Sequence, residues 1–130
     1  MSSRLVSAAV VSSLATDLPG AVFESYSAVS GATRYAVAWV ALSSKERPRY
    51  TGGQWRDVFT VTVHSVGLSQ SQSLWVQERV NKLTGKTLTV AGRKLRPAEY
   101  ITGTPPALDD DGPDPLWFTV SQFDIVSDPA

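Results

Sequence analysis

The chain has 130 residues, no cysteine, one histidine, and twelve acidic residues against twelve basic ones. This length predicts a single domain over residues 1–130 with an ordinary hydrophobic core. The composition excludes disulfides, thiolate metal sites and histidine-cluster metal sites, and the neutral charge argues against nucleic-acid binding through overall charge.

The N-terminal segment predicts a helix that begins at a capping serine at position 2 or 3 and runs to about Asp17, where Pro19-Gly20 ends it. Its apolar residues recur at helical spacing: Val6, Val10 and Leu14. Polar residues from Ser12 onward interrupt the apolar run, so we expect no signal peptide. No stretch approaches the roughly 20 apolar residues of a membrane span, and no membrane partner is expected.

The next segments predict strands joined by a long loop. Residues 21–26 are short and apolar, consistent with a strand. Residues 34–42 are apolar on both faces, which is typical of a central strand, and Trp39 is expected in the core. Residues 43–53 are polar and separate two strong strand patterns, so they are interpreted as a long hairpin loop.

The segment from residue 57 to 83 predicts a strand, a tight turn at Gly67 and an amphipathic helix. In the strand, Trp55, Phe59, Val61 and Val63 share one face with Asp57, and Thr60, Thr62 and His64 share the other. In the helix, capped by Ser69 or Ser71, the apolar stripe is Val76, Val80 and Leu83, widened by Leu74.

The remaining segments predict a short strand at 87–90, an irregular or extended stretch at 93–102, a loop at 105–115, a last strand at 116–126 and a tail at 127–130. Strands joined by hairpin-like loops, with only two helices, indicate an α+β fold. We expect a mostly antiparallel sheet of about four strands, with both helices packed on one face and one long hairpin loop.

No catalytic constellation emerges from these residues. His64 lies alone on the polar face of a strand and is interpreted as structural or solvent-facing, not catalytic. The acidic cluster at 109–114 invites a calcium hypothesis, but an EF-hand would need an oxygen ligand at Ala107 and a glutamate at Phe118. The cluster is therefore expected to be an exposed turn without a metal, or an acidic contact surface.

The basic segment 45–50, together with Arg56, could bind phosphate or an acidic protein face, or could be a plain exposed loop. Trp55 or Trp75 could mark an interface. The candidate interaction residues are Arg47, Arg49, Tyr50, Trp55, Arg56, Asp109, Asp110 and Asp111. No cofactor is expected.

Several segments in order resemble the tail terminator proteins of long-tailed, siphovirus-type bacteriophages, especially those that infect actinobacteria. They are the strand 57–67, the helix with Ser71–Val80, the run Gly92–Pro97, the loop 105–115 and the strand from Leu116. Together they cover residues 34–126, and the match lies in their order and spacing.

The resemblance implies a structural virion protein, not an enzyme, of the tail and neck. It implies a six-fold ring of identical subunits that caps the tail tube, stops its growth and joins the tail to the head. The implied partners are further copies of the chain, the tail tube protein and a connector or stopper protein, and DNA passes through the lumen without specific binding. The alternatives are another neck protein, such as a head-completion, stopper or connector protein, or a small phosphate-binding or enzymatic α+β domain.

Overall fold

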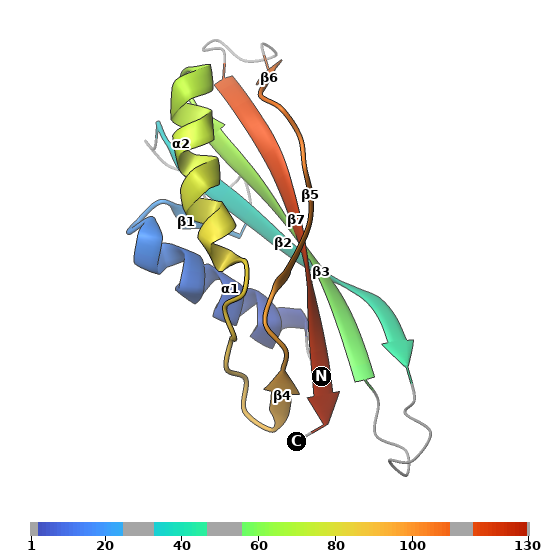
Figure 1. Cartoon of the computed structure of the whole chain (residues 1–130). Helices are drawn as coiled ribbons and strands as arrows, with labels where there is room; N and C mark the ends of the chain where they lie inside the picture. The colour runs from blue at the N-terminus through green and yellow to red at the C-terminus, as the bar shows by residue number, and fades with distance from the viewer. Residues whose placement is uncertain (1–2, 25–32, 47–55, 110–115, 130) are drawn as a thin grey trace.

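The computed structural model describes residues 3–24, 33–46, 56–109 and 116–129 (Figure 1). Two helices and seven strands are present in this part of the chain. In chain order they are α1 (Ser3–Asp17), β1 (Val22–Phe23), β2 (Tyr35–Glu46), β3 (Arg56–Gly67), α2 (Gln70–Val80) with a 3₁₀ turn at Asn81–Leu83, β4 (Arg93–Leu95), β5 (Glu99–Gly103), β6 (Ala107–Asp109) and β7 (Leu116–Pro129).

The strands form one sheet in the order β1-β2-β3-β7, and the three short strands β4, β5 and β6 follow one another along the outer side of β7. Among the described strands, β1 alone pairs in parallel, with β2, and every other pair is antiparallel. The expected α+β class and mostly antiparallel sheet are confirmed, but about four strands was too low a count. Of the additional strands, β4 and β6 have three residues each, too few to show a period of two, and β5 has five residues that are all exposed, so it has no buried face.

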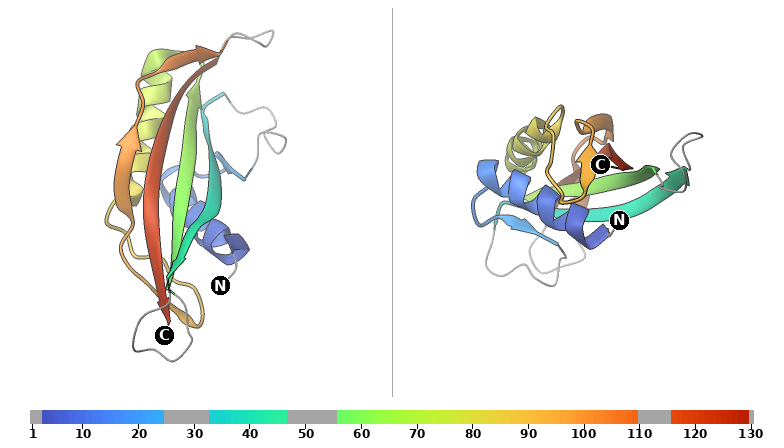
Figure 2. Two further views of the ribbon diagram at one scale, coloured as in Figure 1. Left: turned by 90° about the vertical axis from the view of Figure 1, so that its right-hand side faces the viewer. Right: turned by 90° about the horizontal axis from the view of Figure 1, so that it is seen from below.

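The centre of the sheet is β3, whose side chains alternate between half-buried and fully buried over most of its length. Val61 lies opposite Val40 of β2 and Phe123 of β7, while Phe59 lies opposite Leu42 and Ile125. Directly opposed residues share a face, so Phe59, Val61, Phe123 and Ile125 form the apolar floor on which the helices pack, while Leu42 at its margin is exposed. Both helices cover that same face, as Figures 1 and 2 show.

The helices contribute the apolar stripes that their spacing predicts. In α1 the stripe is buried, with Val6 and Val10 fully covered, and Leu18 extends it beyond the helix. In α2, Val76 and Val80 are fully covered. One detail was wrong: Leu74 does not widen the stripe.

Ser73 takes the position that Leu74 was expected to fill. Its hydroxyl donates to the carbonyl oxygen of Ser65 at 3.1 Å, while Leu74 is 41% exposed. The helix starts very close to the sheet here, as the space around Gly67 shows. A Cβ at Gly67 would lie only 2.7 Å from the Ser73 backbone nitrogen. Only small side chains fit between the two elements at this end.

The start of α2 is capped by Ser69, one of the two predicted caps. Its hydroxyl accepts a hydrogen bond from the backbone N–H of Gln72 at 3.2 Å. The Gln72 side chain reaches back and accepts from the N–H of Leu68 at 2.9 Å. This reciprocal pair satisfies backbone donors that the first helical turn leaves open, so it fixes the turn between β3 and α2.

Several predicted strand boundaries were wrong. The strand predicted at 34–42 continues to Glu46 as β2, so the predicted hairpin loop begins later. This strand is also not central in the sheet, because its outer neighbour β1 pairs with it at only two residues. Trp39 is 37% exposed and does not belong to the core. The strand predicted at 21–26 is reduced to the two residues of β1.

In the C-terminal half, residues 87–90 were predicted as a strand but pair with no described strand. Leu88 and Val90 are nevertheless buried, so the alternation of apolar and polar residues here reflects burial of one face and not pairing with another strand. The stretch 93–102, predicted as irregular or extended, holds β4 and most of β5, whereas 105–115 was predicted as a loop and holds β6. The predicted tail at 127–130 also belongs largely to β7, which continues to Pro129.

Candidate interaction surface

Most of the predicted interaction residues lie outside the described part of the chain. They are Arg47, Arg49, Tyr50, Trp55, Asp110 and Asp111. Asp109 ends β6, and only its backbone is described. Their proposed role in contacts therefore stays a prediction.

Arg56 is the predicted residue whose side chain can be placed, and it pairs within its own subunit. Its Nε donates to a carboxylate oxygen of Asp128 at 2.7 Å, and Arg96 donates to the other oxygen at 3.0 Å. Burial raises the pKa of Asp128, but the hydrogen bonds from Arg56 and Arg96 outweigh it and leave the pKa below its ordinary value. Asp128 thus joins the ends of β3 and β7 to the segment after β4.

Asp57, the polar exception on the apolar face of β3, is almost fully buried. Arg93 and Lys45 place cationic nitrogens 3.9 Å and 3.7 Å from its carboxylate. Arg93 also donates to the hydroxyl and the carbonyl oxygen of Ser127. A buried carboxylate needs such compensation, so this cluster supports the fold at the end of the sheet.

His64 lies on the face of the sheet away from the helices. Its ring meets Trp39 edge-on at 4.7 Å between centroids and stacks on Phe118 at 5.7 Å. Burial lowers the pKa of its imidazole, which favours the neutral form. This packing agrees with the structural interpretation of His64.

A second cluster surrounds Trp75, on the outer side of α2. The guanidinium carbons of Arg34 and Arg79 lie 4.2 Å and 4.1 Å from the centroid of the indole. Such contacts hold a guanidinium over an aromatic face while its N–H groups stay available. Arg79 also donates weakly to the main-chain carbonyl oxygen of Asp17, the last residue of α1, at 3.5 Å.

The carboxylate of Asp17 lies near two lysines on the same side of the molecule as Trp75. This carboxylate lies 3.0 Å from the Lys86 ammonium and 4.0 Å from that of Lys82. The hydrogen bond from Lys86 is the main cause of the lowered pKa of Asp17. With Arg34 and Arg79, this side of the molecule carries four cations around one carboxylate.

An open pocket of about 150 Å³ lies between Asp17 and the indole. We call it the Trp75 pocket; it is lined by Asp17, Leu18, Pro19, Ala21, Arg34 and Trp75. Sequence analysis singled out Trp75 but not its cationic neighbours. The spacing of Trp75 and Arg79, four residues apart on a helix, was the available signal for one of them.

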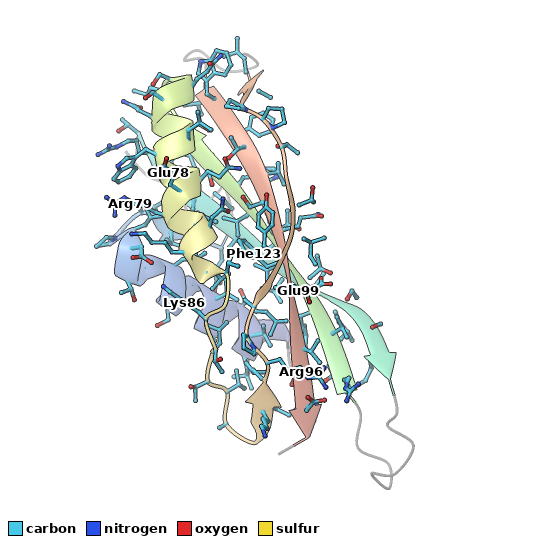
Figure 3. All side chains as sticks on the ribbon, viewed as in Figure 1. Glu78, Arg79, Lys86, Arg96, Glu99 and Phe123 are labelled. Carbon is cyan, nitrogen blue, oxygen red and sulfur yellow. The ribbon has the colours of Figure 1, made fainter. Side chains whose placement is uncertain are left out.

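The opposite edge of the sheet exposes apolar side chains. Tyr100 and Ile101 of β5 and Leu108 of β6 are 42%, 47% and 47% exposed. We call β5 and β6 together the outer edge. Figure 3 places Glu99 on this edge, on the other side of α2 from Arg79.

Within the described ranges, no group of three or more histidine, cysteine, aspartate or glutamate side chains could hold a metal ion. Neither α1 nor α2, the helices in those ranges, is long and apolar enough to span a membrane.

Solved structures resemble the chain over nearly its whole length. A chain from the virion of native gene transfer agent (GTA) particle aligns at a TM-score of 0.72, covering 95% of this chain and 96% of that chain. The two share a fold. Their sequence identity is 13%, so the likeness concerns the fold alone.

A second solved structure aligns at a TM-score of 0.61 with 17% identity, covering 100% of this chain and 98% of that one. No protein-family model matches the chain, and no curated protein is similar to it in sequence.

Proposed function

We propose that the chain is a structural virion protein and, within that class, a tail terminator. The observation that carries the proposal is the shared fold with a chain of the GTA virion, which extends over almost the full length of both proteins. The order of segments over residues 34–126 that resembles tail terminators supports the finer assignment.

The proposed task needs binding surfaces and no catalysis. A tail tube is a stack of head-to-tail rings, and heterologous contacts of this kind allow the stack to grow without a fixed end. A terminator ring offers one face that matches the tube and another that accepts no more tube protein but joins the neck of the filled head. In this proposal the sheet and helices form the rigid body of each subunit, and residues 47–53 and 110–115, which belong to the predicted loops 43–53 and 105–115, make contacts.

The proposed partners are other copies of the chain in a six-fold ring, the tail tube protein and a connector or stopper protein. DNA would cross the ring without specific binding, which the balanced twelve acidic and twelve basic residues favour. The protein would then be part of the tail and neck of the virion, without a cofactor.

Deletion of the gene tests the proposal. We expect filled heads and separate tails of uncontrolled length, with no joined particles, in electron micrographs of the lysate. Expression of the intact chain from a plasmid should restore joined particles. Tails of normal length beside heads that leak DNA would contradict a terminator and favour the stopper or head-completion alternative.

A further inference from the structure

We propose that the Trp75 pocket and the cations around it form a binding site for a glutamate-like side chain of a protein partner, with a short aliphatic stem that ends in a carboxylate. The inference goes beyond the proposed function and does not depend on the tail-terminator assignment. Three features of the described residues carry it: the excess of positive charge around the pocket, the fixed position of one guanidinium group, and the mixed lining of the pocket.

The surroundings of the pocket carry more positive than negative charge. Besides the four cations already described, three acidic residues lie on the same and the adjoining segments. They are Asp17, which already pairs with two lysines, and Glu24 and Glu78, which are exposed and form no ion pair among the described residues. The balance is therefore positive, and a positive surface favours a partner that brings a negative charge.

Arg34 is the group that recognises the carboxylate. Its side chain is exposed, and its guanidinium carbon lies 4.2 Å from the centroid of the Trp75 ring. Within the described part of the chain, no acidic residue forms an ion pair with it. Because the indole holds the guanidinium in place, little side-chain entropy remains to be lost on binding. A guanidinium held in this way can donate two parallel hydrogen bonds to a carboxylate.

The lining of the pocket fits a side chain that is apolar along its stem and charged at its tip. Its apolar wall and its cation come from five residues: Leu18, Pro19, Ala21, the indole of Trp75, and Arg34. A cavity of this volume, about 150 Å³, can hold benzene, and the side chain of glutamate has one non-hydrogen atom fewer than benzene. The two methylene groups of a glutamate would lie against the wall while its carboxylate meets the guanidinium.

The same lining disfavours the phosphate backbone of a nucleic acid. Asp17 also lines the pocket, and the hydrogen bond from Lys86 holds its pKa below the ordinary value, so it stays ionised at neutral pH. A phosphodiester has no aliphatic stem to cover Leu18 and Pro19. Nucleic-acid binding also depends on many phosphate contacts by basic residues, whereas acidic residues balance the basic ones in this chain. An acidic protein segment is therefore the better match.

Titration of short peptides into the purified full chain tests the site. The probe is hexaglutamate with blocked ends, and the matched control is hexaglutamine, which has the same stem without the charge. Two-dimensional NMR spectra of isotope-labelled protein follow the indole N–H signals of the four tryptophans. The signal of Trp75 is identified by its absence in Trp75→Phe. We expect hexaglutamate to shift this signal in a saturable manner and hexaglutamine to leave it in place.

Matched substitutions locate the carboxylate. Arg34→Gln should weaken the binding of hexaglutamate by about fivefold, the upper range for an exposed ion pair. Lys94→Gln, at an exposed lysine of β4, removes the same charge elsewhere and should leave the affinity unchanged. Binding to the unmodified chain should also weaken at about 1 M salt, because salt screens exposed charges. Circular dichroism of both variants checks that they are folded.

Several results would overturn the inference. A Trp75 signal that does not move with hexaglutamate, an equal shift with hexaglutamine, or an unchanged affinity in Arg34→Gln would each show that Arg34 binds no carboxylate there. A larger shift with a short double-stranded DNA would also overturn it, because the site would then recognise phosphate. None of these results alters the expected deletion phenotype, so this inference and the proposed function fail separately.

Discussion

His64 is packed between Trp39 and Phe118, and burial holds the pKa of its imidazole below the ordinary value of about 6.5. The unfolded chain therefore binds a proton more readily than the folded one. Between the lowered pKa and about 6.5, the free energy of unfolding should rise with pH, and above that window it should become flat.

Urea unfolding between pH 5 and 7.5 measures this dependence. In His64→Gln the rise with pH should disappear, because the chain has no other histidine and few other groups titrate there. Identical pH slopes in the variant and the unmodified protein would contradict the lowered pKa.

Gly67 is a second residue with a specific physical role, at the turn from β3 to α2. A Cβ there would lie 2.6 Å from the Cβ of Gln72 and 2.7 Å from the backbone nitrogen of Ser73. We expect Gly67→Ala to reduce the free energy of unfolding by about 1–3 kcal/mol, because the helix must move away from the sheet.

Gly85→Asn is the matched control, measured in the same denaturant titration. Gly85 has a φ of +80° and no atom within 4 Å of its missing Cβ, and asparagine tolerates this backbone conformation. It should cost much less than Gly67→Ala. Equal losses would show that crowding at Gly67 is not the cause.

Among the elements, the hairpin of β6 and β7 leads to a prediction about metal binding. Asp109 pairs with Leu116, so the acidic residues 110–114 belong to a short connection outside the described residues. Their spacing lacks the ligands of an EF-hand. We expect the same melting temperature in millimolar calcium and in a chelator, and a calcium-dependent rise would contradict the prediction.

For the whole molecule, the connection between β2 and β3 is predicted to contact a neighbouring subunit or the tail tube. Replacing Arg47 and Arg49 together by alanine should weaken assembly, measured by native mass spectrometry and by binding to purified tubes, while the melting temperature stays the same. Lys94→Ala is the control, at an exposed lysine of β4. Unchanged assembly in the double variant would count against the prediction.

The sequence by itself determined the large elements of this protein. The helical spacing of Val6, Val10 and Leu14 predicted α1, and the period of two around Phe59 and Val61 predicted β3. These patterns are readable because each element is long enough to repeat its period and has one face on the core. The α+β class followed from their order.

The tertiary structure alone decided the edge of the sheet and the candidate surface. The strands β4, β5 and β6 form because β7 offers them a long unpaired side, which no local pattern reveals. The Trp75 pocket brings together the end of α1, Arg34 just before β2, and α2, which are far apart in the sequence. A pocket is a property of distances between elements, and distances of that kind arise only when the chain folds.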